Sequence, residues 1–368
     1  MNFGVPREVR PLEYRAGLTP ASVHALVGAG HQVFVECGAG LSAGFRDRDY
    51  QAVGGNIVYS AAEAYGRADV VVKVTRPTEA EYERFRSGQV LMAFLHAAVA
   101  SPDLLQALRE REITAVGYET VQADDGTLPV LLPTSEVAGR MAPIIAGQLL
   151  ESVDGGRGIL LSGIPGVPPA AVVILGAGVL GTNAARTFLG VGTEVTVLDK
   201  DLRALQALDR VLEGRVGTML ANPYNVAKAV AFADVLVGAA AVAGERAPVL
   251  VSRAMVQSMQ PRAVIIDFAI DNGGCVETSR PTNHINPSYI EEGVVHYCVP
   301  NVPARVARTA SYALANAILP YLLDIGREGM KLAVESHPDL RRGVNVYKGR
   351  LAHSGLADAL GQEVEVEL

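Results

Sequence analysis

The chain has 368 residues, of which 49% are hydrophobic and 19% are charged, and its 32 Lys and Arg against 39 Asp and Glu give a formal net charge of −7. This composition excludes a disordered chain and predicts a globular protein whose length suits two domains. Because no block of Lys and Arg stands out we expect no nucleic-acid partner, and three scattered cysteines without ligand spacing predict neither a disulfide framework nor a metal site.

The first third of the chain alternates short β-branched runs with helical patterns. The runs that predict strands cover residues 32–36, 69–74, 90–95 and 113–118, and a helical pattern covers residues 135–150. Residues 1–10 also alternate like a strand, and they carry charges where a signal peptide needs an apolar run. This rhythm is typical of βαβ units around a parallel sheet.

After two Gly-rich loops the same rhythm starts again at residue 170. Strands are predicted at residues 170–175, 194–198, 217–220, 235–238, 263–268 and 294–297. Helices are predicted at residues 179–189, 202–212, 224–233 and 305–323. The pattern is that of a complete doubly wound domain. The most apolar runs are short or interrupted by glycine, so no membrane-spanning segment is expected.

We expect the last long helix to return to the first domain. The predicted fold class is therefore α/β with two doubly wound domains. A Rossmann domain at residues 129–305 is inserted in a discontinuous domain made of residues 1–128 and 306–368.

The strongest local signal is a G-A-G-V-L-G motif between an apolar strand and a helix. In a dinucleotide-binding fingerprint Gly176 makes the tight turn, Gly178 lets the backbone approach the pyrophosphate, and Gly181 lets helix and strand pack closely. The helix that opens at Val179 offers unpaired N–H groups to the phosphates. The motif therefore predicts a dinucleotide site.

Asp199 ends the following strand, where a carboxylate accepts hydrogen bonds from ribose hydroxyls and repels a 2′-phosphate. We therefore predict NAD as the cofactor. The neighbouring Lys200 keeps NADP open as an alternative. A second alternative is that Asp199 only caps the helix that begins near Leu202.

Three further residues have the chemistry and placement of catalytic groups. His96 stands at the carboxyl end of an apolar strand, and an imidazole suits proton exchange with an amine or carbonyl. Asp271 follows another buried strand and precedes two glycines. Arg15 lies in a polar loop, and a guanidinium can hold a carboxylate with two hydrogen bonds. The alternatives are a hydrogen-bonded strand end for His96, an Asx turn for Asp271 and a solvated arginine.

Over nearly its whole length the chain resembles the alanine dehydrogenase family, which is related to the NAD-binding subunit of proton-translocating transhydrogenase. The segments that carry the resemblance are residues 4–8, 13–15, 94–96, 118–122, 135–140 and 163–167, the fingerprint glycines, and residues 271–275 and 299–303. So many segments in the right order are far more specific than any single motif.

The resemblance implies a substrate domain built from both chain ends, an NAD domain between them, and a cytoplasmic homo-oligomer, commonly a hexamer. It implies that Arg15 binds the substrate carboxylate, that His96 is the acid and base, and that Asp271 assists near the nicotinamide and the water. The cofactor contacts that it implies are Ser135, Asp199, Phe268, Ala269, Ile270, Asp271, Arg280, Val299, Asn301 and Val302.

One departure from the family concerns the substrate. The family typically reads Lys-Val-Lys-Glu-Pro, with the second lysine touching the substrate, whereas this chain has Lys73 followed by Val74, Thr75, Arg76 and Pro77. Side chains 73 and 75 of an extended strand share a face, so we expect Lys73 to replace part of the missing charge. Arg76 is the other cation nearby.

The sequence thus predicts an NAD-dependent dehydrogenase that interconverts L-alanine with pyruvate and ammonia and has no metal. A first alternative keeps the scaffold and changes the amino acid or 2-oxo acid, since Thr75 lacks the family charge. A second alternative is a transhydrogenase-like NAD(H)-binding subunit without an amino-acid substrate.

Overall fold

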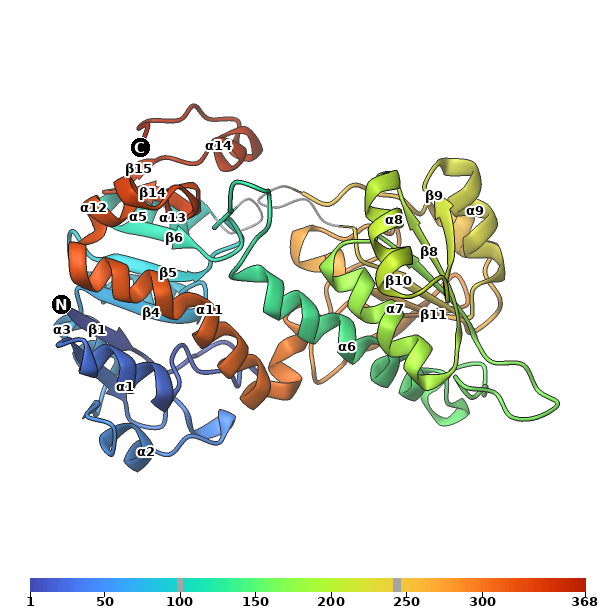
Figure 1. Ribbon diagram of the computed structural model, residues 1–368, viewed down its shortest axis with the longest axis horizontal. Coiled ribbons are helices and arrows are strands. Elements are labelled where there is room, and N and C mark those ends of the chain that lie inside the picture. The colour runs from blue at the N-terminus through green and yellow to red at the C-terminus, as the bar shows by residue number, and fades with distance from the viewer. Residues whose placement is uncertain (98–101, 241–245) are drawn as a thin grey trace. The chain divides into compact units, whose positions relative to one another are not determined.

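The computed structural model describes residues 1–97, 102–240 and 246–368. The chain divides into two compact units. The first unit is formed by Met1–Thr134 and Pro303–Leu368, and the second unit by Ser135–Val242 and Arg246–Val302. Both ends of the chain therefore belong to the first unit (Figure 1).

Among its described residues the first unit holds an eight-stranded sheet. Its spatial order is β15 (Arg350–Leu351), β14 (Val344–Tyr347), β6 (Thr114–Gly117), β5 (Val90–Phe94), β4 (Val70–Thr75), β1 (Asn2–Val5), β2 (Gln32–Glu36) and β3 (Asn56–Val58). The run from β6 to β3 is parallel, and the β14 and β15 edge is antiparallel. Because β1, β4, β5 and β6 are parallel, their carboxyl ends share one edge of the sheet.

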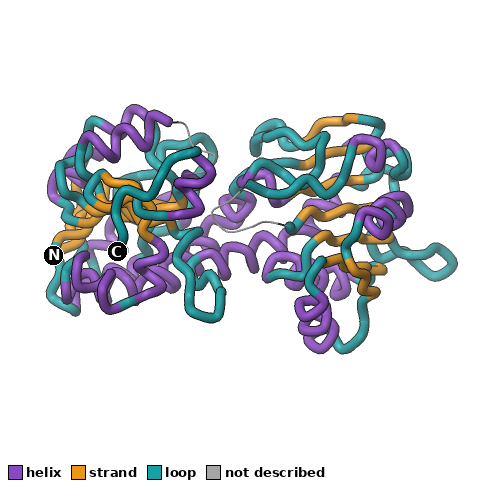
Figure 2. Tube along the Cα trace, turned by 90° about the horizontal axis from the view of Figure 1, so that it is seen from above, coloured by secondary structure: helices purple, strands orange, loops and turns teal. Residues whose placement is uncertain are grey.

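Helices cover this sheet on both faces (Figure 2). They are α1 (Pro20–Gly28), α2 (Asp47–Gln51), α3 (Ala61–Arg67), α4 (Glu79–Tyr82), α5 (Pro102–Glu110), α11 (Ala307–Glu328), α12 (Met330–Ser336), α13 (Pro338–Gly343) and α14 (Ser354–Leu360), with 3-10 turns η1 (Leu41–Ala43) and η5 (Val302–Val306). The long helix α6 (Leu131–Leu149) begins in the first unit and continues into the second.

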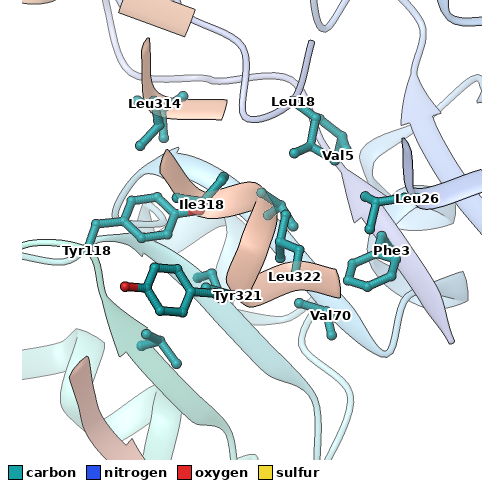
Figure 3. Close-up of a cluster of buried hydrophobic side chains, with 14 of the residues drawn as sticks. Phe3, Val5, Leu18, Leu26, Val70, Tyr118, Leu314, Ile318, Tyr321 and Leu322 are labelled. Atoms are coloured by element: carbon teal, nitrogen blue, oxygen red, sulfur yellow. The ribbon is translucent and has the colours of Figure 1, made fainter. Parts of the chain in front are cut away.

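Helix α11 supplies much of the core of the first unit (Figure 3). Its residues Leu314, Ile318 and Leu322 recur every four positions, so they lie on one face of the helix. They are fully buried in a cluster with Phe3 of β1 and Val70 of β4. Burying each such side chain contributes about 1.5–3 kcal/mol. A segment from the end of the chain thus stabilises strands from its beginning.

The second unit holds a seven-stranded sheet within its described residues. Its spatial order is β12 (Ser288–Glu291), β13 (Val294–Tyr297), β11 (Val264–Asp267), β10 (Val235–Gly238), β7 (Ala171–Leu175), β8 (Glu194–Asp199) and β9 (Gly217–Leu220). The helical elements of this unit are α7 (Val179–Val191), α8 (Leu202–Val211), α9 (Pro223–Phe232), α10 (Arg253–Gln257), η3 (Ser152–Asp154) and η4 (Phe268–Asn272). All strand pairs are parallel except β12 with β13.

Both sheets grow outward in two directions from a central strand pair, β1 and β4 in the first unit and β7 and β10 in the second. This is the doubly wound arrangement. The predicted α/β fold class is therefore confirmed. Among the described residues, no helix combines the length and the apolar composition needed to cross a bilayer.

The structure differs from the predicted elements mainly at their ends and at the sheet edges. Helix α6 begins at Leu131 rather than at residue 135, and it includes Pro133 in its first turn, where a missing N–H is tolerated. Helix α11 continues through Pro320 to Glu328, beyond the predicted end at residue 323. Strands β3, β12, β14 and β15 were not predicted.

Candidate active site

In the first unit, aromatic and charged side chains gather where β5 and β6 end. The guanidinium of Arg15 lies over the ring of Phe94, 6.0 Å from its centroid. The ring of His96 is stacked with that of Phe94, with centroids 6.0 Å apart and planes inclined by 17°. Tyr118 contacts Phe94 edge-on at 5.2 Å. The structure therefore brings Arg15 and His96 to one aromatic ring.

His96 has an unusual backbone conformation and an unusual environment. Its φ of +43° is left-handed, which residues other than glycine seldom adopt. Its N–H donates to Glu119 Oε1 at 2.7 Å, and the N–H of Leu95 donates to Oε2 at 3.1 Å. His96 Nδ1 is buried and has no hydrogen-bond partner among the described residues. A buried unpaired nitrogen is costly, so the ring suits contact with a ligand.

Arg15 is held in one orientation by Glu13. The arginine is 4% exposed. Its Nε and one Nη each donate to a different oxygen of Glu13, both at 2.8 Å, and its backbone N–H donates to the same carboxylate at 3.0 Å. Such a fork is charge-assisted and fixes the plane of the guanidinium. Glu13 thus orients the group that the sequence predicts as an anchor for a carboxylate.

Lys73 is fully buried and ion-paired within the first unit. Its Nζ lies 2.9 Å from Glu81 and 3.2 Å from Glu8. Burial alone lowers the pKa of Lys73, but the two carboxylates outweigh it and the net pKa is raised. Thr75 Oγ1 donates to the same Glu8 at 2.6 Å. This burial argues against the predicted contact between Lys73 and substrate, because the charge of Lys73 is already balanced inside the domain.

The fingerprint glycines of the second unit each meet a different steric demand. Gly176 has a φ of +115°, and a Cβ there would lie 2.7 Å from the carbonyl oxygen of Ala239. A Cβ on Gly181 would lie 1.9 Å from the carbonyl oxygen of Gly176. A Cβ on Gly178 would meet no atom within 4 Å. Open space therefore lies beside the start of α7 at Val179, as the approach of a phosphate requires.

These glycines predict two distinguishable mutant phenotypes. Gly181→Ala should lower thermal stability, because the new methyl group forces α7 away from β7. Gly178→Ala should leave the melting temperature within about 1 °C of wild type and weaken NADH binding about tenfold or more, because the methyl group enters the phosphate space. Thermal melts and NADH fluorescence titrations check both. Equal NADH affinity in wild type and Gly178→Ala would contradict this placement of the phosphates.

Asp199 lies beside this glycine turn. Its Oδ2 accepts a hydrogen bond from the N–H of Ala177 at 2.7 Å, and its Oδ1 accepts one from the N–H of Asp201 at 2.9 Å. The cap of α8 is Asp201, whose side chain accepts from the N–H of Arg203 at 2.8 Å. The alternative that Asp199 caps this helix is therefore wrong. Its position suits a ribose hydroxyl.

The loop that carries Asp271 is fixed by a buried neighbour. Asp267 at the end of β11 accepts hydrogen bonds from the backbone N–H groups of Ala269, Cys275 and Val276 at 3.0, 2.9 and 3.2 Å. Burial raises the pKa of Asp267, and hydrogen bonds from Ser279, Cys275 and Val276 offset the shift only in part. Asp267 therefore holds η4 and the following glycines in place.

Asp271 and Asn301 meet in the second unit. Asp271 Oδ2 accepts a hydrogen bond of 3.5 Å from the N–H of Asn301, which has a φ of +63°. Among the predicted cofactor contacts nearby, those that keep partial exposure are Phe268, Asp271 and Asn301. Those at most 5% exposed are Ala269, Ile270, Val299 and Val302. The burial of these four argues against contact through their side chains.

Arg280 and Ser135 are the remaining predicted cofactor residues. Arg280 is exposed, and its guanidinium lies 3.9 Å from the ring centroid of Tyr289. The N–H of Arg280 donates to the Tyr289 hydroxyl at 2.9 Å. The ring of Tyr289 is also stacked with the ring of His296, and their centroids are 5.0 Å apart. Tyr289 therefore anchors Arg280, while Ser135 is half-buried within α6.

Four carboxylates of the first unit were not singled out from sequence. Glu13, Glu81 and Glu119 are buried, and the side chain of Glu8 is only 3% exposed. Each of the four contacts a predicted residue or its backbone. Glu8 and Glu119 follow the carboxyl ends of β1 and β6, so the rule that selected His96 would also have found these two. Nothing local to Glu81 indicates its pairing with Lys73.

A metal-ligand type cluster also occurs in the first unit. Asp324, Glu328 and His337 place possible ligand atoms within 4.8 Å of one another. Arg327 pairs with Asp324 at 2.8 Å and with Glu328 at 2.6 Å. Because this guanidinium is ion-paired with both acidic groups, the cluster forms an ion-pair network.

Together, the two doubly wound sheets, the glycine turn beside Asp199 and the Arg15 and His96 group define a two-domain α/β protein with a Rossmann-type dinucleotide-binding fold. Models of the alanine dehydrogenase/PNT N-terminal and C-terminal domains match residues 4–138 and 142–354. The chain belongs to the alanine dehydrogenase/PNT family.

Individual relatives match over almost the full length. An alanine dehydrogenase of Methanococcus maripaludis is 47% identical over 98% of this chain and 96% of its own length. A solved L-alanine dehydrogenase structure superposes with a TM-score of 0.92 and 44% identity, covering 98% of this chain and 99% of the other. A transhydrogenase structure from Sinorhizobium meliloti has a TM-score of 0.80 and 26% identity, covering 96% and 99%.

Proposed function

We propose that this protein is an NAD-dependent oxidoreductase that interconverts L-alanine with pyruvate and ammonia. The observation that carries the proposal is the pair of Arg15 and His96 on the Phe94 ring, at the carboxyl edge of the first sheet. At this edge a cation can bind the carboxylate of a small amino acid, and an imidazole can exchange protons with it. Full-length relatives named alanine dehydrogenase at 44–47% identity favour alanine as the substrate.

Arg15 and His96 have separate tasks in this proposal. Arg15 binds the carboxylate of alanine or pyruvate, in an orientation fixed by Glu13. His96 exchanges protons with the reacting nitrogen and oxygen, and its unpaired buried Nδ1 suits that contact. Asp271 lies in the second unit next to Asn301 and helps to position the water.

The second unit would hold the cofactor. Gly176, Gly178, Gly181 and the start of α7 suit the pyrophosphate, and Asp199 suits the adenosine ribose. A bound NAD⁺ would supply the acceptor for the hydride that leaves Cα of the amino acid. The side chains of the protein bind and orient the substrate and move its protons.

The direct test is an assay of the full chain. Purified protein should oxidise NADH when both pyruvate and ammonium are present, and should reduce NAD⁺ with L-alanine but not with D-alanine. No turnover with these substrates, in protein that binds NADH, would overturn the alanine assignment.

The position of Thr75 supports a second candidate, a dehydrogenase for a different amino acid or 2-oxo acid. Thr75 is uncharged and Lys73 is enclosed, so neither offers a cation to a carbonyl oxygen in this structure. A panel of L-amino acids with NAD⁺ separates the candidates by kcat/KM. A non-alanine substrate preferred by tenfold or more would favour this second candidate.

The transhydrogenase-like alternative has weaker support, because the transhydrogenase structure is 26% identical and the alanine dehydrogenase structure 44%. Hydride exchange between two nucleotides without an amino acid would favour it.

Asp199 should determine the choice between NAD and NADP. A carboxylate within about 4 Å of a phosphate opposes binding by roughly 1–4 kcal/mol near a protein surface. Asp199→Asn should therefore raise the ratio of kcat/KM with NADP to kcat/KM with NAD about tenfold or more. Asp201→Asn, which changes the neighbouring helix cap, should leave that ratio unchanged. An unchanged ratio in Asp199→Asn would contradict the NAD assignment to this residue.

We further propose that the protein is a cytoplasmic homo-oligomer, specifically a hexamer. Family membership supports this proposal. Light scattering of the purified chain gives the molar mass, and a monomer at micromolar concentration would overturn the oligomer.

A further inference from the structure

The backbone at His96 occupies a strained conformation that something must stabilise. For a residue with a side chain, a left-handed φ such as the +43° of His96 is energetically unfavourable. The imidazole is attached at the Cα of this residue, so the direction of the side chain depends on that φ. If the turn relaxed, the ring would move relative to Phe94 and Arg15.

Glu119 is the group that contacts this backbone. Its two carboxylate oxygens accept hydrogen bonds from the successive backbone N–H groups of Leu95 and His96, at 3.1 and 2.7 Å. Both hydrogen bonds are charge-assisted, which makes them roughly twice as strong as neutral ones. Glu119 is 5% exposed, so little water competes for its oxygens.

Glu119 belongs to the turn that follows β6, and hydrogen bonds of Thr120 hold that turn. The Thr120 hydroxyl donates to the carbonyl of Gly117 at 3.0 Å and accepts from the Asn345 side chain at 2.7 Å. A Cβ on Gly117 would lie 2.9 Å from the Thr120 hydroxyl and 3.1 Å from Glu119 Oε1. Glycine at position 117 therefore leaves room for the Glu119 carboxylate.

We propose that Glu119 is a positioning residue for His96. Its carboxylate holds the left-handed backbone and so directs the imidazole towards the substrate. Glu119 acts through the backbone and does not touch the substrate. This inference rests on the proposed role of His96 in proton transfer.

Glu119→Gln is the first test. The amide keeps one acceptor oxygen but presents an NH₂ group to the other backbone N–H, so one of the two hydrogen bonds is lost. We expect kcat to fall about 10–100-fold, while KM for alanine and the NADH dissociation constant stay within about twofold. Glu110→Gln, which removes an exposed carboxylate of α5, should leave all three values unchanged.

Amide hydrogen exchange supplies a readout that does not depend on activity. In the NADH-bound protein, Glu119→Gln should speed exchange of the peptide that contains Leu95 and His96, and leave peptides of the second unit unchanged. Unaltered exchange in that peptide would overturn the proposal.

The route of action is tested by uncoupling the ring from the backbone. His96→Gly removes the imidazole, tolerates the left-handed φ, and leaves a space that added imidazole can fill. Adding Glu119→Gln to this variant should not change its imidazole-supported kcat, since free imidazole is not attached to the backbone. A further 10–100-fold loss would overturn the proposal and show that Glu119 acts by another route.

The same series separates this inference from the proposed function. If His96→Gly without imidazole were as active as wild type, the role of His96 would fail, whatever Glu119→Gln does. If His96→Gly were inactive and Glu119→Gln kept wild-type kcat, only the positioning role would fail.

Discussion

His96→Asn is expected to reduce kcat for alanine oxidation by about 10²–10⁴-fold, the usual contribution of a general acid or base. Asparagine is chosen because it tolerates the left-handed φ of +43° better than most residues. The Glu119 hydrogen bonds to the backbone can then persist. The folded structure should survive, so the loss reports on the imidazole alone.

The matched control is His24→Asn, at an exposed histidine of α1. It should leave kcat and KM unchanged. Steady-state kinetics with saturating NAD⁺, together with melting temperatures, make the comparison. Wild-type turnover in a folded, NADH-binding His96→Asn protein would remove His96 from the reaction.

Lys73→Met is expected to destabilise the protein by about 3–5 kcal/mol, as removing one partner from a buried ion pair does. Methionine matches the length of lysine but leaves Glu8 and Glu81 facing each other without a cation. Urea unfolding followed by circular dichroism measures the loss. The control is Lys331→Met, which removes an exposed pair with Glu335 at 4.0 Å and should cost less than about 1 kcal/mol.

The effect of Lys73→Met should also depend on pH in a defined direction. Burial raises the pKa of Glu81, but Lys73 outweighs it and the net pKa is lowered from 4.5, while the pKa of Lys73 is raised from 10.5. The stabilisation is therefore complete between about pH 4.5 and 10.5. It decreases below that range as Glu81 binds a proton, and above it as Lys73 loses one. If the difference in unfolding free energy between wild type and Lys73→Met were as large at pH 3 as at pH 7, the ion-pair explanation would be contradicted.

The central strands were predictable because they are buried on both faces. Val90–Phe94 and Val235–Gly238 are continuous apolar runs that fit a parallel sheet. The edge strands were not predictable. Asn56–Val58 has three residues and Arg350–Leu351 has two, too few for an alternation to stand out. These edge strands form because they pair with a neighbouring strand, and the local sequence does not indicate that pairing.

Prediction of the candidate site followed the same division. Asp199 is the last residue of β8, and His96 and Asp271 follow shortly after the ends of β5 and β11, so local sequence could single them out. Lys73 looked like an available cation because its partner Glu8 is distant in the chain and nothing local indicates the pairing with Glu81. Thr75 and Glu8, which share that buried network, are 67 positions apart. Ion pairing over such separations arises only from the folded sheet.

The place of α11 in the first unit has a consequence for how the chain acquires its structure during synthesis. Strands β1 and β4 leave the ribosome early, but Leu314, Ile318 and Leu322, which cover them, are made only after the whole second unit. The second unit is contiguous apart from its short break and can complete its own core first. Until translation is almost finished, the earliest strands lack the part of their apolar cover that α11 supplies.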